Sequence, residues 1–360
     1  MIINEFIPKP YKHLLDSGAV AFSAPSNIAL VKYWGKKAHQ IPANPSISFT
    51  LNNCKTATTL RFEKKKSGGF SFDVFLERKL QEDFKPKIEQ FFKRIELYLP
   101  FLKAYHFTIE TSNTFPHSSG IASSASGMSA LALCLMQIEQ QLNPEISQAF
   151  FNKKASFLAR LGSGSACRSI EGDLIVWGAH DQIEGSSDLV GVKYPYEVHQ
   201  NFKNYRDTIL LVDKGEKQVS STVGHNLMHD HPFADQRFAL AHSNMEDLIT
   251  VLKSGDLKAF ISIVEREALT LHAMMMSSDP YFILMKPNTL EIINKLWVFR
   301  AKTGLHVCFT LDAGANVHVL FPENEANEIQ EFIKTELAVH CQNGHFIEDK
   351  LGQGAQQLKI

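Results

Sequence analysis

The sequence predicts an α+β protein that is divided into two domains. The chain has 360 residues, and at roughly 100–200 residues per domain this length indicates about two domains. Runs with β-type alternation dominate the first third, whereas segments with helical periodicity cluster later. This order of elements is typical of an α+β fold rather than of strict βαβ alternation.

Runs rich in β-branched and aromatic residues between turn-forming residues predict the strands. In chain order they are Val20–Phe22, Ile47–Leu51, Ala57–Phe62, Phe70–Phe75, Tyr105–Glu110, Leu174–Trp177, Thr208–Val212, Leu305–Phe309 and Val317–Phe321. Apolar residues that recur every three or four positions predict the helices. These are Lys85–Leu99, Ser123–Gln140, Glu145–Leu161, Phe233–Lys253, Leu257–Met275, Thr289–Lys302 and Glu323–Leu337. We place the domain boundary near 201–206, with domains of residues 1–205 and 206–360.

Composition and charge exclude several classes of function. Lys and Arg total 37 against 38 Asp and Glu, a formal net charge of −1, which argues against a nucleic-acid or polybasic membrane partner. The five cysteines are widely spaced without a CxxC pair, which favours reduced thiols. Residues 1–10 lack an apolar signal core, and the longest apolar run, Ala130–Met136, is too short to span a membrane. We therefore expect a cytoplasmic protein.

A serine- and glycine-rich stretch, residues 115–127, leads into the apolar helix predicted from Ser123. Small residues let a ligand approach the backbone, and serine hydroxyls and the N–H groups of a first helical turn donate to anions. This combination suits a nucleotide triphosphate, although no Walker A pattern is present. A serine-capped helix with tight packing is the alternative interpretation.

A second cluster, Gly162–Ser169, follows a predicted helix. It lacks the third glycine of a dinucleotide fingerprint and the preceding strand, so a Rossmann site is a poor interpretation. Ser163, Ser165 and Arg168 could converge on an anion, since arginine matches phosphate and carboxylate geometry with paired donors. A glycine-rich turn with Arg168 in a structural ion pair remains the alternative.

Two further segments carry candidate charged residues. Lys32 stands between Val31 and Tyr33, and a lysine buried among such neighbours needs an anion; a lysine that lies along apolar surface with its amine in water is the alternative. Asp312 follows a predicted strand in a Leu-Asp-Ala-Gly turn. A carboxylate at such a position can act as a base or an electrostatic stabiliser, or it can simply bond to its own turn.

Three histidines, His225, His229 and His231, show spacings that occur in metal sites. No nearby thiolate or glutamate completes a ligand set, so we interpret them as structural. The metal ligands therefore stay unknown at this point.

Taken together, these segments resemble the diphosphomevalonate decarboxylase family of the GHMP kinase superfamily. The matching stretches occur in the family's order and extend from about residue 20 to about residue 320. They are Asn27–Ala29, Lys32–Lys36, Ser46–Ser48, Ser119–Gly127, Gly162–Ser169, Val219–Thr222, His272–Ala273 and Asp312–Gly314. The strings KYWGK and GSGSACRS are the most specific of these.

The resemblance implies a two-domain GHMP kinase fold, α+β overall, with a ribosomal protein S5 domain 2-like N-terminal domain, a ferredoxin-like C-terminal domain and an active-site cleft between them. It implies ATP- and Mg²⁺-dependent decarboxylation of (R)-5-diphosphomevalonate to isopentenyl diphosphate, with release of ADP, phosphate and CO₂. A homodimer is usual in the family and is expected here.

The resemblance also implies roles for residues that match the family's motifs. Asp312 resembles the catalytic carboxylate near the substrate's tertiary hydroxyl, Arg168 the residue that orients the substrate carboxylate, and Lys32 the cation that bridges Asp312 and the reacting groups. The expected contacts of diphosphomevalonate are Tyr33, Lys36, Ser163, Ser165 and Ser221. The expected ATP phosphate loop comprises Ser118, Ser119, Gly120, Ile121, Ala122, Ser123 and Ser124.

Two other functions stay open at the level of sequence. One is a small-molecule kinase of the same superfamily, or a decarboxylase that acts on a related mevalonate phosphate. The other is a catalytically silent ligand-binding relative, although the sequence retains Lys32, Arg168 and Asp312 together. Release of CO₂ distinguishes a decarboxylase from the kinase and from the silent relative, and the choice of substrate distinguishes the two decarboxylases.

Overall fold

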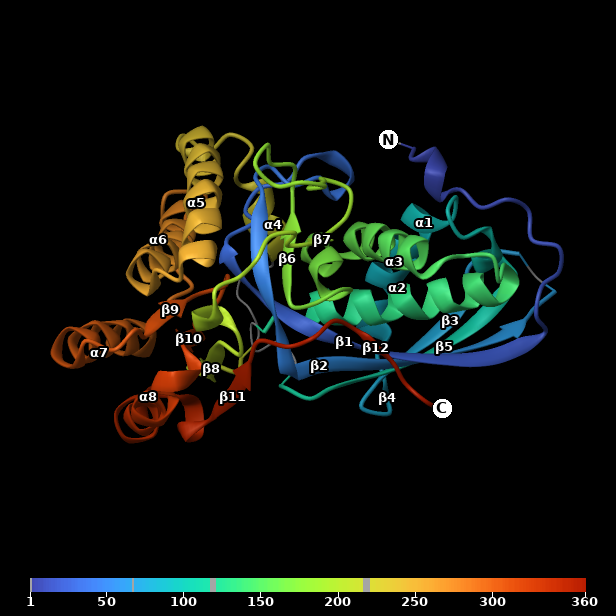
Figure 1. The fold of residues 1–360 in the computed structure, drawn as a ribbon. Helices are drawn as coiled ribbons and strands as arrows, with labels where there is room; N and C mark the ends of the chain where they lie inside the picture. Colours follow the sequence, from blue (N-terminus) through green and yellow to red (C-terminus); the bar gives the residue numbers. More distant parts are fainter. Residues whose placement is uncertain (1, 67, 117–120, 216–220) are drawn as a thin grey trace.

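The computed structural model describes residues 2–66, 68–116, 121–215 and 221–360, and these fold around two β-sheets (Figure 1). The larger sheet has the strand order β12-β1-β2-β5-β3-β4, with β6 paired to β2 and β7 paired to β6. Its strands are β1 (Ser17–Val31), β2 (Ser46–Lys64), β3 (Phe72–Leu76), β4 (Lys79–Leu80), β5 (Tyr105–Asn113), β6 (Leu174–Trp177), β7 (Val192–Lys193) and β12 (Gln356–Gln357).

Three helices cover one face of the larger sheet: α1 (Lys85–Ile95), α2 (Ser123–Leu142) and α3 (Gln148–Gly162) (Figure 1). Helix α2 is buried on nearly all sides, as expected for a helix that is apolar around most of its circumference. Its side chains form one core with those of α1, α3 and the sheet. This rigid layer fixes the start of α2, where the serine-rich stretch ends.

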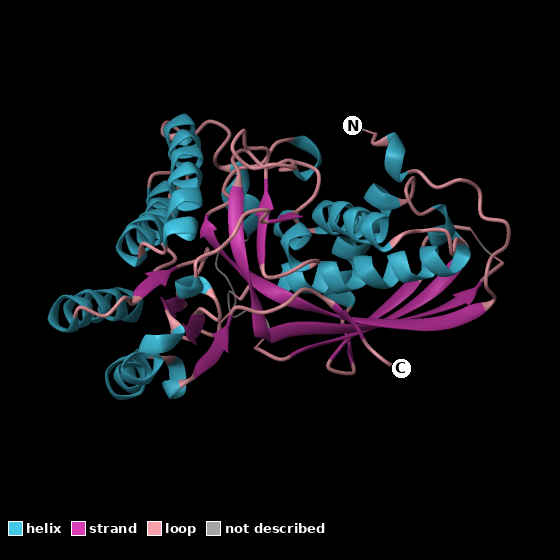
Figure 2. Ribbon diagram, viewed as in Figure 1, coloured by secondary structure: helices cyan, strands magenta, loops and turns pink. Residues whose placement is uncertain are grey.

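The smaller sheet is antiparallel, with the order β11-β8-β10-β9, and most of the remaining helices lie on its side of the molecule (Figure 2). Its strands are β8 (Arg206–Leu210), β9 (Cys308–Thr310), β10 (Val317–Phe321) and β11 (Phe346–Lys350). The helices are α4 (Ser221–Asn226), α5 (Ala234–Ser254), α6 (Leu257–Met276), α7 (Pro287–Thr303) and α8 (Ala326–Phe332).

A shared apolar cluster joins the two sheets. It combines β1 and β2 side chains such as Leu30 and Phe49 with Met245 of α5, Phe260 of α6 and Leu320 of β10. The end of the chain also returns to the first sheet, where β12 pairs with β1. The C-terminal end of β1, which Lys32 directly follows, is thereby held against helices from the other half of the chain.

The predicted strands Ile47–Leu51 and Ala57–Phe62 are parts of one long strand, β2. The intervening residues Asn52 and Asn53 form an irregularity in its pairing with β1. Their backbone N–H groups donate to the buried Asp349 carboxylate at 2.9 and 2.8 Å. The acceptor for these N–H groups lies 297 residues away in the sequence. The local sequence therefore predicts a break at a place where the strand in fact continues.

Other predicted elements differ mainly at their ends. The helix predicted over Glu323–Leu337 is a 3₁₀ turn, the short helix α8 and a π-helical turn at Ile333–Leu337. The strand predicted from Leu305 begins only at Cys308. Within the part of the chain that the structure describes, none of the helices combines the length and apolar character needed to cross a bilayer.

Candidate active site

Segments from both halves of the chain meet at a cavity of about 390 Å³. The residue after β1, the start of α2, the turn after α3, helix α4 and the loop after β9 all contribute to it. Its lining includes seven of the predicted catalytic and substrate-binding residues: Lys32, Tyr33, Lys36, Ser163, Ser165, Arg168 and Asp312. Ser221 begins α4, and its side chain lies outside the described part.

Lys32 and Asp312 form an ion pair inside this cavity. Lys32 Nζ lies 3.0 Å from Asp312 Oδ1, and the lysine side chain is 2% exposed whereas that of the aspartate is 29% exposed. Burial lowers the pKa of the Lys32 ammonium, and the neighbouring Asp312 charge partly offsets this effect. The carboxylate therefore faces the cavity while it holds a buried cation, so Asp312 does more than bond to its own turn.

Arg168 supplies a second buried cation to the same cavity. Its guanidinium donates to Ser46 Oγ and, at 3.3 Å, to Asn27 Oδ1, and it lies 5.9 Å from the Trp177 ring centroid. Burial lowers the pKa of Arg168. No ion pair among the described residues includes Arg168. A buried, neutrally hydrogen-bonded arginine is poised for an anionic ligand.

A network beneath the cavity holds Lys32 in place. The buried Glu267 carboxylate accepts the backbone N–H of Lys32 at 2.8 Å and pairs with Arg237 at 2.5 Å. Asn244 donates to the other Glu267 oxygen. Asn44 donates to the Lys32 carbonyl at 2.9 Å. Both backbone groups of Lys32 are therefore satisfied by side chains from distant segments.

Histidine contacts position two backbone segments of the site. His272 Nε2 lies 3.1 Å from the carbonyl oxygen of Asp312, and burial lowers the pKa of His272 to about 4. The neutral ring therefore donates its Nε2 proton to that carbonyl. His225 Nδ1 accepts the Gly35 N–H at 3.0 Å, and the ring packs against Tyr33. The structural interpretation of His225 fits these contacts, although the ring also lines the cavity.

Only part of the predicted phosphate loop lies within the described residues. Ser118, Ser119 and Gly120 lie outside them. The Ile121 side chain is buried in the apolar cluster that joins the two sheets, not in the cavity lining. Ala122, Ser123 and Ser124 do line the cavity, and Ser124 Oγ lies 3.4 Å from Ser163 Oγ. The first and second serine-rich segments therefore meet.

A second, more apolar cavity of about 270 Å³ adjoins the first. Lys87, Ser123 and Ser124 line both cavities. The walls of the second cavity come from β2, β3, β5, α2, α1 and the turn before α1, and include Thr56, Thr58, Val74, Phe84, Ile109, Gly127, Met128 and Leu131. Apart from Gly127, which ends the family-like stretch Ser119–Gly127, sequence motifs indicated none of these residues, because their place in a cavity wall is set only when the elements pack.

Sequence reasoning also missed several residues that support the site. Glu267, Arg237, Asn244 and Asn44 act on Lys32, and Ser46 and Asn27 act on Arg168. Ser46 and Asn27 fall within segments that resemble the family's motifs, so the sequence could have identified them as site residues. Glu267 and Arg237 carried no such signal within their helices.

Comparison with known protein families identifies the family of this chain. Residues 24–188 match the model of the diphosphomevalonate decarboxylase-like N-terminal domain, and residues 208–359 match that of the mevalonate 5-diphosphate decarboxylase C-terminal domain. The chain belongs to the diphosphomevalonate decarboxylase family. All the described predicted site residues, from Lys32 to Asp312, lie inside the two matched segments.

Curated members and solved structures of the diphosphomevalonate decarboxylase family agree with this assignment. The Ganoderma lucidum diphosphomevalonate decarboxylase is 29% identical over 86% of this chain and 80% of its own length. A structure in complex with MVAPP, AMPPCP and magnesium is 28% identical, with a TM-score of 0.81 over 96% of this chain and all of its own. The Enterococcus faecalis mevalonate diphosphate decarboxylase is 27% identical, with a TM-score of 0.80 over the same shares. The GHMP kinase-type fold expected from the sequence is thus confirmed.

Proposed function

We propose that this chain catalyses the ATP-dependent decarboxylation of (R)-5-diphosphomevalonate to isopentenyl diphosphate, with ADP, phosphate and CO₂ as the other products. The observation that carries the proposal is the pair of buried cations, Lys32 and Arg168, around the one carboxylate, Asp312, among the described residues of the cavity. Buried cations in excess of anions require an anionic ligand. A substrate with a carboxylate and a diphosphate supplies that charge.

Each charged residue has a role that follows from its position. Arg168, held by Ser46 and Asn27, binds the substrate carboxylate through paired N–H donors. Lys36, Tyr33, Ser163, Ser165 and Ser221 are the proposed contacts of the diphosphate. Asp312 accepts the proton of the tertiary hydroxyl as the alcohol oxygen bonds to the terminal phosphorus of ATP and ADP leaves. Lys32 holds Asp312 ionised and oriented.

The second step needs charge stabilisation rather than proton transfer. When the new phosphate leaves the tertiary carbon, positive character grows there, and the electrons of the bond to the carboxylate form the double bond as CO₂ departs. The fixed Asp312 anion stabilises that positive character. The phosphate group carries away the electrons of the carbon–oxygen bond, so the step needs no oxidant or further reactant.

The nucleotide fits across the two adjoining cavities. The base and ribose would occupy the cavity with the more apolar walls, and the phosphates would pass Ser123 and Ser124 into the cavity of Asp312. The start of α2 has no side-chain cap among the described residues, so its N–H groups suit phosphate oxygens.

The residues present also fit magnesium that arrives with ATP. The described residues contain no cluster of three or more His, Cys, Asp or Glu side chains that could hold a metal ion. Mg²⁺ keeps several waters and binds through one or two carboxylates together with substrate phosphates. Asp312, Ser123 and Ser124 are its proposed protein contacts, and when bound the ion neutralises phosphate oxygens.

A direct test supplies the purified protein with ATP, Mg²⁺ and (R)-5-diphosphomevalonate, and follows ADP, CO₂ and isopentenyl diphosphate in parallel. We expect equal amounts of all three. ADP without CO₂ would identify a kinase of the same superfamily, and the absence of turnover despite ATP binding would identify a silent relative. The same assay with mevalonate 5-phosphate tests the alternative function, a decarboxylase that acts on a related mevalonate phosphate.

Filling the second cavity should impair nucleotide binding specifically. A Cβ atom added at Gly127 of α2 meets nothing within 4 Å, and Gly127 lines that cavity. We expect Gly127→Leu to raise the KM for ATP by roughly 10- to 100-fold, because an overfilled pocket costs about 1–3 kcal/mol, while the KM for diphosphomevalonate stays near its original value. Gly127→Ala is the matched control and should stabilise the helix by about 0.5–1 kcal/mol. An unchanged KM for ATP in Gly127→Leu would exclude this nucleoside site.

The ionisation of Lys32 should set an alkaline limit on activity. Burial lowers the pKa of Lys32 below its ordinary value of 10.5, so its charge is lost as pH rises through a value below 10.5. We expect kcat/KM to fall over that range. Lys32→Arg should move the fall to higher pH, because a guanidinium stays protonated. Since burial also lowers the pKa of Lys36, Lys36→Arg is measured alongside; a fall that moves only in Lys36→Arg would contradict the assignment.

The homodimer and the cytoplasmic location implied by the family resemblance are proposals, as are the domain limits of 1–205 and 206–360. Exposed apolar side chains on α7, Leu290 and Val298, offer a surface on which a second copy could pack. Sedimentation equilibrium of the wild type and of a Leu290→Glu, Val298→Glu double variant tests the dimer.

A further inference from the structure

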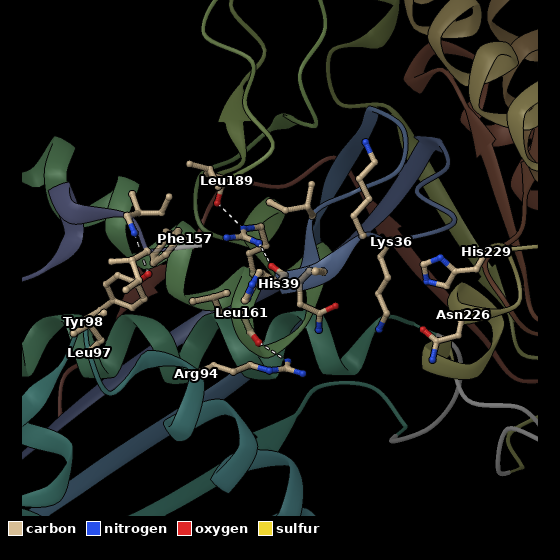
Figure 3. A pocket seen from close by; sticks show the side chains of 17 residues that line it. Lys36, His39, Arg94, Leu97, Tyr98, Phe157, Leu161, Leu189, Asn226 and His229 are labelled. Carbon is tan, nitrogen blue, oxygen red and sulfur yellow. Dashed lines mark hydrogen bonds between the residues drawn. The ribbon is translucent and has the colours of Figure 1, made fainter.

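A larger cavity of about 640 Å³ (Figure 3) shares part of its lining with the proposed reaction cavity. Its walls come from the N-terminal segment, the loop at residues 36–41, α1, the end of α3 and α4. Lys36 and Gln40 line both cavities. Its volume lies within the roughly 300–1,000 Å³ of cavities that bind small molecules.

One part of this cavity is strongly cationic. Lys36, Lys37, Arg94 and Arg160 line it, and its described lining contains no Asp or Glu. None of these four side chains takes part in an ion pair among the described residues, whereas most other arginines do. Burial lowers the pKa of Arg94, and burial together with the Arg94 charge lowers that of Lys36. Four cations that form no ion pair among the described residues, gathered in one cavity, favour an anionic ligand.

The arginine side chains are fixed in place by backbone carbonyls. Arg160 is 1% exposed and donates to Leu189 O at 2.7 Å and to His39 O at 2.5 Å. Arg94 donates to Leu161 O at 2.8 Å. A guanidinium has five N–H donors, so neutral carbonyls that occupy one or two of them orient the group without cancelling its charge.

The opposite part of the cavity is apolar. Figure 3 shows Leu97, Tyr98 and Phe157 at one end, Lys36, Asn226 and His229 at the other, and Arg94 and His39 between them. The apolar lining also includes Ile2, Ile3, Ile41, Leu161 and Leu189. Ile2 is 65% exposed and Leu97 is 43% exposed, so apolar surface here is left open to water, which favours burial by an apolar group.

We propose that this cavity binds an amphiphile with a diphosphate head and a short branched apolar tail, with the head between Arg94, Lys36 and Lys37 and the tail against Leu97 and Phe157. This ligand belongs to the chemical class of the product of the proposed function, and that part of the inference rests on the proposed function. The cavity is distinct from the one that contains Asp312, so the ligand acts as a regulator rather than as a substrate.

Occupation of the cavity affects the reaction through two shared residues. Lys36 is a proposed contact of the substrate diphosphate and also lines this cavity. The loop that carries it contains His39 and Gln40, both with positive φ, at 58° and 59°, so its shape is narrowly determined. A bound head group that engages Lys36 withdraws this cation from the substrate and raises the KM for diphosphomevalonate.

Direct binding tests the site without reference to turnover. Calorimetry with geranyl diphosphate, isopentenyl diphosphate, inorganic diphosphate and geraniol is compared for the wild type, Arg94→Gln, Lys37→Gln and Leu97→Ser. We expect geranyl diphosphate to bind most tightly. Arg94→Gln and Lys37→Gln each weaken it by roughly 10- to 100-fold, the effect of a lost charge-assisted contact. Leu97→Ser weakens geranyl diphosphate and leaves inorganic diphosphate unchanged. Lys302→Gln, an exposed lysine at the end of α7, is the control.

Variants of the reaction cavity separate the two locations. Arg168→Gln and the double variant Ser163→Ala, Ser165→Ala should retain geranyl diphosphate binding. If they lose it while Arg94→Gln and Lys37→Gln retain it, the ligand lies in the reaction cavity and the proposal is overturned. If inorganic diphosphate binds as tightly as geranyl diphosphate, the apolar tail contributes nothing, and the proposal of an amphiphilic ligand is overturned. The CO₂ assay on the wild type tests the proposed function separately, so either proposal can fail alone.

Discussion

Replacing Asp312 by asparagine should lower turnover by ~10³-fold or more, since preorganised charge at the reacting centre contributes several kcal/mol to the barrier. The carboxylate lies 3.0 Å from the buried Lys32 ammonium and faces the cavity. Asparagine keeps the shape and one hydrogen-bond acceptor, but it neither accepts the hydroxyl proton nor stabilises positive charge on the tertiary carbon. The measurement is kcat from CO₂ release at saturating ATP and diphosphomevalonate.

Controls for this prediction separate chemistry from folding. Asp247→Asn removes an exposed carboxylate from α5 and should leave kcat unchanged. Circular dichroism and the thermal midpoint show whether Asp312→Asn is folded. Because burial lowers the pKa of Lys32 and Asp312 opposes this, removing the carboxylate should lower that pKa further. Near-normal CO₂ release from a folded Asp312→Asn protein would refute the catalytic assignment.

Among the substitutions proposed here, replacing Glu267 by alanine should cause the largest loss in the free energy of unfolding. The Glu267 side chain is fully buried, pairs with the buried Arg237 and accepts the backbone N–H of Lys32. Removing it leaves a guanidinium and an N–H group without their acceptor inside the protein. Breaking a buried pair in this way costs about 3–5 kcal/mol. Urea denaturation of wild type and variant measures the difference, and Glu246→Ala on the exposed side of α5 is the matched control.

A double variant tests whether the loss comes from the unpaired charge. Glu267→Leu, Arg237→Met replaces both partners by apolar side chains, and a buried ion pair replaced in this way often costs little. We therefore expect the double variant to be more stable than Glu267→Ala. Its KM and kcat should still suffer, because the Lys32 backbone loses an acceptor beside the site. If Glu267→Ala unfolds no more easily than wild type, Glu267 does not support the site.

The two predicted glycine- and serine-rich segments show how much of the site a sequence motif can predict. Ser123, Ser124, Ser163 and Ser165 do line one cavity, whereas Ser126 and Ala166 of the same two segments are fully buried. Ile121, in the middle of the same predicted loop, is instead buried in the apolar cluster. A loop motif identifies the segment, but the direction of each side chain depends on what packs against it.

Apart from Lys36, which ends the KYWGK string, the charged residues of the proposed amphiphile cavity belong to no sequence motif. Arg94 lies on α1, Arg160 near the end of α3 and Lys36 in the loop after β1. Taken singly, Arg94 and Arg160 do not stand out in a chain with nearly balanced charge. Their concentration without a carboxylate arises only when the three segments pack together.

By itself, the sequence determined the α+β class, most of the elements and the identity of the charged residues, because side-chain periodicity and short-range turn chemistry are local properties. The tertiary structure alone decided that β2 runs unbroken past Asn52, that Lys32 meets Asp312 across 280 residues, and that Glu267 lies beneath them. Those outcomes depend on burial, and burial depends on which distant segments exclude water from one another.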